Sequence, residues 1–505
     1  MEPLLEGLAL LADPFNIFLI FVGVFVGVMV GALPGLSSPM AVALLLPFTI
    51  TLEPVPAIAM MAALYCAGTF GGSITAILIN APGAPPAAAT AFDGYPMAKR
   101  GEAGRALGLA AVSSISGGIF GIVIFLLAAP TLAKVALSFR PPEYFALAVF
   151  ALSMLASISG KSSLRNLIAG AVGVLIGTMG IHLTTGVERF TFGLPELTEG
   201  IEFVPVLIGL FALAELLKQS QTLNVVYERI TSVVIRLPSR EDLRKVRGTI
   251  LRSSGIGTFI GILPAEGATV AAIMGYNEAR RWSKNKEAFG TGVPEGIAGP
   301  EAANNAATGG AMVPTLALGI PGSATTAIIL AALIMHGFRP GPYLMKETPA
   351  FIYAIFGAML VANFMFLAIG LAGAKIFSRI TLIPRALLWP MVFTFSLIGA
   401  YALGSSIFDV WVTLVAGIIG FLMLRHGFGT APLVMGLILG KLVEESLSQS
   451  MIMFDNNWLR FFESPIVLLF FVLTVFGLFW TPLVRLFATI SARWGRRAGD
   501  ASTTK

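Results

Sequence analysis

Long apolar runs recur along the whole chain, and they constrain its fold more than any other feature. A helix needs about 20 apolar residues to cross about 30 Å of hydrocarbon, and only 12% of the residues are charged. The runs lie near residues 15–50, 57–80, 105–130, 142–158, 166–185, 203–217, 253–278, 302–335, 350–374, 384–403, 407–424, 430–447 and 464–487. We therefore predict a single all-α polytopic membrane domain over residues 1–505, with about 10 to 14 membrane segments, some of them re-entrant.

Basic residues are concentrated outside the apolar runs. The interval 218–252 is rich in Arg and Lys, and the tail at residues 488–505 is also basic. Cytoplasmic loops of inner-membrane proteins carry an excess of Lys and Arg. We therefore predict that residues 218–252 form a cytoplasmic connecting loop and that the C-terminal tail is cytoplasmic. The basic residues behind the net charge of +6 are then expected to face anionic lipid, which argues against nucleic-acid binding.

The two halves of the chain repeat one another. The pattern GxxxGxLP occurs at residues 27–34 and 257–264, and a GG pair followed by PG occurs at 71–72 and 82–83 and again at 309–310 and 321–322. Residues 15–217 and 253–487 are thus predicted to be two repeated halves, each with two Pro/Gly-broken helical segments. Paired interruptions of this kind mark the binding sites of secondary transporters.

Charge indicates how the two halves are oriented. The first half follows an acidic N-terminal stretch, whereas the second follows the basic interval 218–252. The halves are therefore predicted to be inverted. The segments flanking each Leu-Pro break are estimated at about 15 residues, or about 22 Å at 1.5 Å per residue, which is too short to cross alone. This length predicts re-entrant hairpins that return to their starting side.

The first break in each half is a candidate binding segment. Proline removes a backbone donor and glycine permits unusual dihedrals, so an unwound helix offers N–H groups to an anion and carbonyl groups to Na⁺. Glu266 is the only acid of its apolar stretch, so it is a candidate for carrying a proton or ligating Na⁺, with a structural acid as the alternative. A structural kink is the alternative at each break. The candidate residues are Pro34, Gly35, Ser37, Ser38, Pro264, Glu266, Gly267 and Thr269.

The second break in each half adds small polar side chains. They sit among Ala and Gly, which favours either ligand binding or close helix packing with interhelical hydrogen bonds. A purely structural role for Asn304 and Asn305 therefore stays open. Asp93-Gly94 is predicted to form a turn beside Lys99. The candidates are Ser73, Asn80, Pro82, Gly83, Asn304, Asn305, Pro321, Gly322 and Ser323.

The sequence argues against an enzyme. Its three histidines, His182, His336 and His426, are scattered and lack the spacing of metal ligands. No phosphate-binding Walker motif is present. We expect no catalytic residue and no cofactor; the coupling ion is Na⁺ or H⁺, and Na⁺ near the Pro/Gly breaks is the only metal considered.

Several long motifs resemble one family of permeases. PEAANNAATGG with PTLALGIPGSATTA, together with GALPGLSSPMAVALLLPFT, ILINAPG, DGYPMAKRGEAGRALG, GILPAEGAT and HGFRPGP, is similar in order to the large membrane subunit of tripartite tricarboxylate transporters, the TctA-type permease. The resemblance covers about residues 15 to 450. It departs from the family at Pro264-Ala265-Glu266-Gly267, where Pro-Gly-x-Gly is usual, and at Ser73, where some citrate-type members carry Arg.

The resemblance implies a multi-pass secondary transporter of the bacterial inner membrane. Such a permease works with a periplasmic solute-binding protein and a small four-helix membrane subunit. It imports carboxylates, such as citrate or other tri-, di- or monocarboxylates, driven by a Na⁺ or H⁺ gradient. The departures leave mono- and dicarboxylates as open as tricarboxylates. A passive channel or facilitator for organic anions is the alternative.

Overall fold

A computed structural model describes residues 2–158, 163–182, 184–221, 236–264, 267–380 and 385–478. The first part contains α1 (Glu2–Leu11), α2 (Pro14–Gly31), α3 (Ser38–Thr49), α4 (Pro54–Ile79), η1 (Pro85–Ala87), α5 (Ala88–Met97), η2 (Ala98–Glu102), α6 (Ala103–Ala136), α7 (Pro141–Ile158), α8 (Ser163–Gly177), β1 (Gly180–Ile181), β2 (Glu188–Arg189), η3 (Pro195–Leu197), α9 (Phe203–Ile208), η4 (Gly209–Leu213) and α10 (Ala214–Ser220). The second contains α11 (Arg240–Ile262), α12 (Gly267–Trp282), η5 (Lys286–Ala288), α13 (Pro294–Leu318), α14 (Ala324–Met335), α15 (Pro342–Glu347), α16 (Pro349–Ile380), α17 (Arg385–Gly404), α18 (Ile407–Arg425), α19 (Thr430–Met453) and η6 (Trp458–Glu463).

Six helical segments in the described part of the chain are long and apolar enough to cross a membrane. They are Pro14–Gly31, Pro54–Ile79, Pro85–Ala136, Phe203–Ser220, Pro349–Gly373 and Ile407–Arg425. Shorter apolar helices accompany them, among them Ser163–Gly177 and Pro465–Leu478. The chain is thus a multi-pass membrane protein built mainly of helices, as predicted, with one short two-stranded sheet of β1 and β2. The expected total of membrane segments and the inverted orientation of the halves stay predictions.

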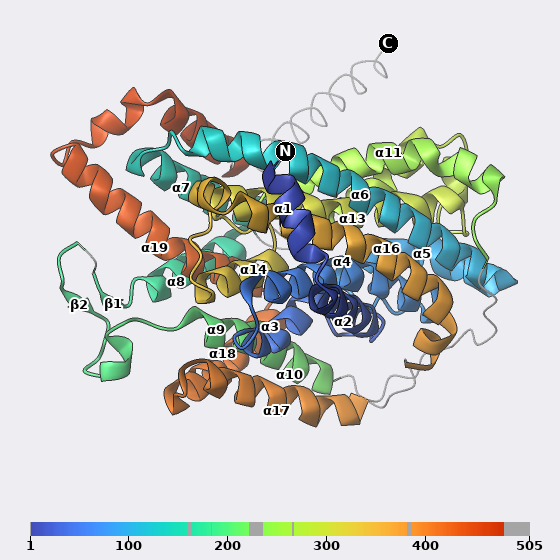
Figure 1. The fold of residues 1–505 in the computed structure, drawn as a ribbon, viewed down its shortest axis with the longest axis horizontal. Coiled ribbons are helices and arrows are strands. Elements are labelled where there is room, and N and C mark those ends of the chain that lie inside the picture. Colours follow the sequence, from blue (N-terminus) through green and yellow to red (C-terminus); the bar gives the residue numbers. More distant parts are fainter. Residues whose placement is uncertain are drawn as a thin grey trace, which may run out of the picture.

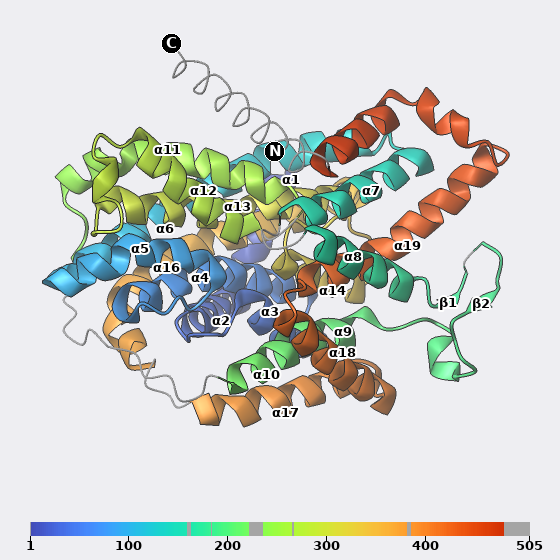
Figure 2. The same ribbon diagram turned by 180° about the vertical axis from the view of Figure 1, so that it is seen from behind.

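Helices α4 and α13 form the centre of the fold, with α2, α6, α11 and α16 around them (Figures 1 and 2). Every residue of α4 from Pro56 to Ile79 is buried, and so is every residue of α13 from Gly296 to Ala317. These two helices carry the residues that lead into the second break of each half. Within the breaks, Ala81, Gly83 and residues 320–322 are buried, whereas Asn80 is exposed. Unwound backbone at membrane depth is tolerated where it is buried in protein or lines a cavity.

Glycines allow the central helices to touch backbone to backbone. A Cβ atom at Gly27 would lie 2.7 Å from the carbonyl oxygen of Leu64 on α4, and a Cβ at Gly257 would lie 2.1 Å from that of Ala303 on α13. Separations below 3.0 Å require the backbone to move. The α2–α4 contact in one half and the α11–α13 contact in the other therefore depend on the same kind of small-residue packing.

Two sequence predictions about local structure are wrong. Residues 240–252, predicted within a connecting loop, form the first part of α11, because Ser239 and Asp242 make a capping box that begins a helix there. Asp93, predicted in a turn, is buried within α5, where its carboxylate accepts backbone N–H groups from the chain before α13.

The predicted length of the segments before the Leu-Pro breaks is also wrong. Helix α2 has 18 residues and α11 has 23, against the estimated 15 or so. At 1.5 Å per residue, α2 spans about 27 Å, and it is long and apolar enough to cross a membrane. The argument from length for re-entrant hairpins therefore fails for these two helices.

Candidate functional site

The structure interrupts the helices at all four predicted breaks. Helix α2 ends at Gly31 before α3 begins at Ser38, and α11 ends at Ile262 before α12 begins at Gly267. Helix α4 ends at Ile79, six residues before η1, and α13 ends at Leu318 before α14 begins. The pattern of glycine and proline was therefore sufficient to locate the places where the chain leaves helical geometry.

The second break has the same backbone geometry in both halves. Asn80 ends α4 with φ 52°, and Gly319 ends α13 with φ 71°, both in the left-handed region. The residue that follows donates its N–H back to the helix, Ala81 to Thr75 over 3.4 Å and Ile320 to Pro314 over 3.2 Å. This is a common helix ending, and asparagine is the residue after glycine that best tolerates it.

The two breaks within each half also contact one another. A Cβ atom at Gly83 would lie 1.8 Å from the carbonyl oxygen of Gly31, and a Cβ at Gly322 would lie 2.9 Å from that of Gly261. The glycine of the Pro-Gly pair thus packs on the last turn of the helix before the Leu-Pro break in both halves. No side chain fits between them, so these glycines hold the breaks together.

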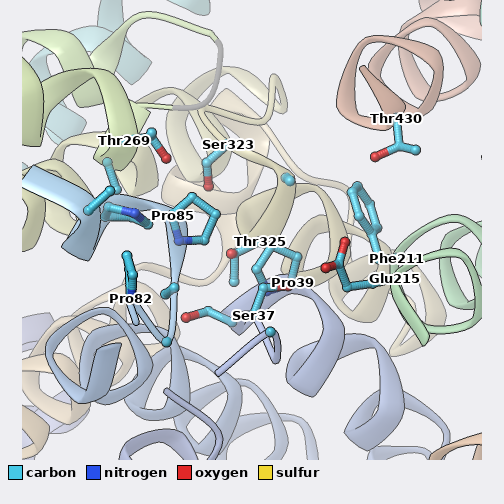
Figure 3. A pocket seen from close by; sticks show the side chains of 18 of the residues that line it. Ser37, Pro39, Pro82, Pro85, Phe211, Glu215, Thr269, Ser323, Thr325 and Thr430 are labelled. Carbon is cyan, nitrogen blue, oxygen red and sulfur yellow. The ribbon is translucent and has the colours of Figure 1, made fainter. Parts of the chain in front are cut away.

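A cavity of about 450 Å³ lies where the breaks meet (Figure 3). Eight of the predicted site residues line it, namely Gly35, Ser37, Ser38, Pro82, Gly83, Gly267, Thr269 and Ser323. They come from both halves of the sequence, and the fold brings them to one place.

Helix N-termini border this cavity. Helices α3, α12 and α14 begin at Ser38, Gly267 and Ala324, each lining the cavity. Ser37 and Ser323 cap α3 and α14 by accepting N–H bonds from Met40 at 3.4 Å and Thr326 at 3.2 Å. The first N–H groups of a helix and its dipole favour negative charge. The lining therefore suits a carboxylate held by N–H groups and hydroxyls.

The cavity also contains residues that the sequence did not indicate. They include one charged pair, because Lys218 lies 3.4 Å from Glu215 on the same helix, α10. The Tyr65 hydroxyl lies 3.2 Å from that of Ser323. No short motif marks these positions, which reach the cavity only through packing of distant helices. Other residues of this kind are Pro39, Phe211, Thr325 and Thr430.

The remaining predicted site residues do not line this cavity. Five of them belong to the breaks but are not among the lining residues, namely Pro34, Pro264, Pro321, Gly322 and Asn80. Ser73, Asn304 and Asn305 lie inside the helix packing of α4 and α13. Glu266 lies outside the described residues.

Asn304 and Asn305 are part of a buried polar cluster. The Asn305 amide donates to the Asn304 side-chain oxygen at 2.7 Å and to the Glu301 backbone carbonyl at 3.2 Å. In the part of the chain that the structure describes, the Asn304 amide nitrogen and the Asn305 amide oxygen have no hydrogen-bond partner. Glu301 itself, which was not a predicted site residue, is fully buried in this cluster.

A second cavity, of about 900 Å³, is lined in part by the start of the α13–α14 break. Gly319 lines it, as do three basic residues, Arg140, Arg339 and Lys441, against one acid, Glu445. The sequence did not predict this basic lining, because the three residues belong to separate segments. Only Ile320, Pro321 and Gly322 separate Gly319 from Ser323, which lines the first cavity.

Comparison with known proteins agrees with the motifs. Residues 17–435 match the tripartite tricarboxylate transporter TctA family. An uncharacterized 52.8 kDa protein in the TAR-I ttuC' 3' region of Agrobacterium vitis is 41% identical over 453 residues, which cover 90% of each chain. An uncharacterized protein in the TAR-II ttuC' 3' region of the same organism is 36% identical over 210 residues, 42% of this chain and 87% of that protein. No solved structure matches. This chain therefore belongs to the tripartite tricarboxylate transporter TctA family.

Proposed function

We propose that this protein is the large permease subunit of a binding-protein-dependent secondary transporter that imports small carboxylates on a Na⁺ or H⁺ gradient. Its partners are a periplasmic solute-binding protein and a small four-helix membrane subunit. Its location is the bacterial inner membrane, with the C-terminus in the cytoplasm. The observation that carries the proposal is the cavity where the broken helices of both halves meet.

The chemistry of that cavity supports a carboxylate substrate. N–H groups at the starts of α3, α12 and α14, with the hydroxyls of Ser37, Thr269 and Ser323, offer several donors to an anion. The volume of about 450 Å³ is in the range of small-molecule sites. Pro34, Pro264, Pro321 and Gly322, which lie outside this lining, would act by shaping the breaks.

The second cavity supports transport by alternating access. Arg140, Arg339 and Lys441 give it a basic lining that raises the local concentration of anions. We propose that the two cavities open toward opposite faces of the membrane and that the α13–α14 break separates them. Movement of one repeat against the other would then expose the substrate to each side in turn.

The test is uptake of a panel of radiolabelled carboxylates, including citrate, succinate and lactate, by cells that express this chain with its small partner subunit. Each acid is measured with and without the periplasmic binding protein, and with the Na⁺ or proton gradient collapsed. Uptake that needs both the binding protein and a gradient is the expected result. Uptake that needs neither favours a passive facilitator, and no uptake of any acid overturns the proposed substrate class.

A further inference from the structure

Glu301 on α13 is a fully buried carboxyl group that hydroxyls from three other helices surround. Ser73 on α4 and Thr90 on α5 donate to its Oε1, and Ser114 on α6 donates to its Oε2 at 2.7 Å. Each of these side chains has at most 1% of its surface exposed. The carboxyl group therefore has polar contacts on both oxygens and no contact with water.

No cation accompanies this group. None of the ion pairs in the described part of the chain includes Glu301. A buried carboxylate without a positive partner carries a large desolvation cost, which binding of a proton removes. Neutral hydroxyls alone offset that cost only in part.

The other titratable groups on the helices around Glu301 either contact residues other than Glu301 or are at least partly exposed. Asp93 on α5 accepts three backbone N–H bonds and the Tyr276 hydroxyl. Arg105 on α6 pairs with Asp242, and Cys66 on α4 faces Thr308 at 3.8 Å. The others are Tyr65 on α4, in contact with Ser323, Tyr95 on α5, the exposed Lys134 on α6 and the partly exposed Glu295 on α13.

On the opposite face of α13, close contacts among the described residues are made by small, uncharged residues. Gly299 and Ala303 there pack on Gly275 of α12 and Gly257 of α11. A neutral site is thus enclosed by α4, α5 and α6, and the titration of Glu301 changes its net charge by one. Such a change in a buried site is strongly coupled to the conformation that buries it.

We propose that Glu301 is the site at which this transporter binds its coupling proton. The proposal rests on the proposed function and deepens it, since it assigns the coupling ion and the residue that holds it. In a conformation that opens the site to one face, a hydronium ion gives its proton to a Glu301 oxygen: its O–H bond breaks, an O–H bond forms on Glu301, and a water molecule is left. In the opposite conformation the O–H bond on Glu301 breaks, and the proton passes to water on the other face.

The geometry favours a proton over a metal cation. Oε1 accepts two hydroxyl hydrogen bonds and Oε2 accepts one, which leaves one of the roughly four lone-pair sites of the carboxyl group for a proton. A cation such as Na⁺ would need several oxygen ligands and would have to displace these hydrogen bonds. A proton needs no coordination space. The amide nitrogen of Asn304, three residues further along α13, has no hydrogen-bond partner among the described residues, so it can donate to the carboxylate when Glu301 is ionised.

Infrared difference spectroscopy of the purified protein tests protonation without any substrate. We expect a C=O band of a protonated carboxylic acid near neutral pH that disappears at high pH and is missing in Glu301→Gln. The control, Glu287→Gln, changes an exposed glutamate and should keep the band. Identical spectra of the wild type and Glu301→Gln at every pH would overturn the proposal.

A second variant separates titration from a purely structural role. Ser114→Ala removes the donor to Oε2, which stabilises the ionised form, so the band should persist to higher pH. An unchanged titration in Ser114→Ala, with the protein eluting as a single species, would contradict the assignment to Glu301. Because Gln keeps the shape of Glu and can still accept hydroxyl bonds, Glu301→Gln is expected to fold.

Transport in proteoliposomes tests coupling. With the accessory subunits and labelled citrate, succinate or lactate, Glu301→Gln should lose accumulation driven by a pH gradient while it retains exchange of labelled for unlabelled substrate. Accumulation equal to that of the wild type would overturn the proposal. If the wild type transports no acid, the proposed function fails, and the infrared titration alone decides whether Glu301 holds a proton.

Discussion

Gly319 and Ser323 stand at the two ends of one helix break, and they line different cavities. The intervening residues Ile320, Pro321 and Gly322 are buried. The opposite ends of one short piece of unwound backbone therefore line the two cavities.

Thiol labelling tests whether the cavities open to opposite faces. Thr269 lines the first cavity and Lys441 the second, and the single native cysteine, Cys66, is buried. In right-side-out and inside-out vesicles, a membrane-impermeant thiol reagent should label Thr269→Cys and Lys441→Cys from opposite sides. The unsubstituted chain should stay unlabelled, and labelling of both variants from the same side would contradict the two-sided pathway.

Two glycines on α11 form a matched pair for testing helix packing. A Cβ atom at Gly257 would lie 2.1 Å from the Ala303 carbonyl oxygen, whereas a Cβ at Gly255 meets nothing within 4 Å. Gly257→Ala should lower the free energy of unfolding by about 1 to 3 kcal/mol through overpacking. Gly255→Ala should be neutral or stabilising by up to about 1 kcal/mol. Thermal unfolding in detergent measures both, and equal effects would show that the close contact is unimportant.

The ion pair between Arg105 and Asp242 predicts a pH dependence of stability. Their atoms lie 2.5 Å apart, and the hydrogen bond from Arg105, with those from Ser239, holds the pKa of Asp242 below its usual value. A lowered folded pKa means that the pair stabilises the fold above the unfolded pKa of about 3.9. This contribution is lost as the pH falls through the folded pKa.

We therefore expect Asp242→Asn to lower the thermal midpoint at pH 7 and the difference from the wild type to shrink in acid. The matched control is Glu241→Gln, an exposed neighbour in the same helical turn, which should have little effect at either pH. A difference for Asp242→Asn that does not depend on pH would contradict the ionic origin of the stabilisation.

Lys218 is the basic residue of the first cavity, so it should assist anion binding. Its side chain is 54% exposed and is paired with Glu215, and an exposed charge contributes up to about 1 kcal/mol, so Lys218→Gln should raise the KM for the transported acid by about twofold to fivefold. Higher salt should reduce the difference. Lys134→Gln, an exposed lysine that does not line the cavity, is the control, and equal KM values for both variants would remove Lys218 from the site.

Local patterns in the sequence predicted where the helices break, but they did not predict the conformation of every neighbouring segment. Proline and glycine act on their own backbone, so the ends of α4 and α13 follow from Asn80-Ala81-Pro82 and Gly319-Ile320-Pro321 directly. The basic run predicts a loop where the structure has the first part of α11, because Arg and Lys are common in loops, whereas the Ser239–Asp242 capping box begins a helix there. The polarity of residues 240–252 indicated that they lie outside the apolar membrane segments, but it did not indicate that they are helical.

The sequence by itself determined the membrane class, the four breaks and the glycine repeat, because hydrophobicity and backbone freedom are properties of single residues and short segments. Only the tertiary structure decided which candidates share a cavity. It brought Ser37, Thr269 and Ser323 together and directed Ser73 toward Glu301 instead. The orientation of a side chain on a buried helix depends on which neighbour the glycines allow to approach. Which helices pack together depends on contacts between segments far apart in the chain. A local sequence pattern carries no information about such contacts.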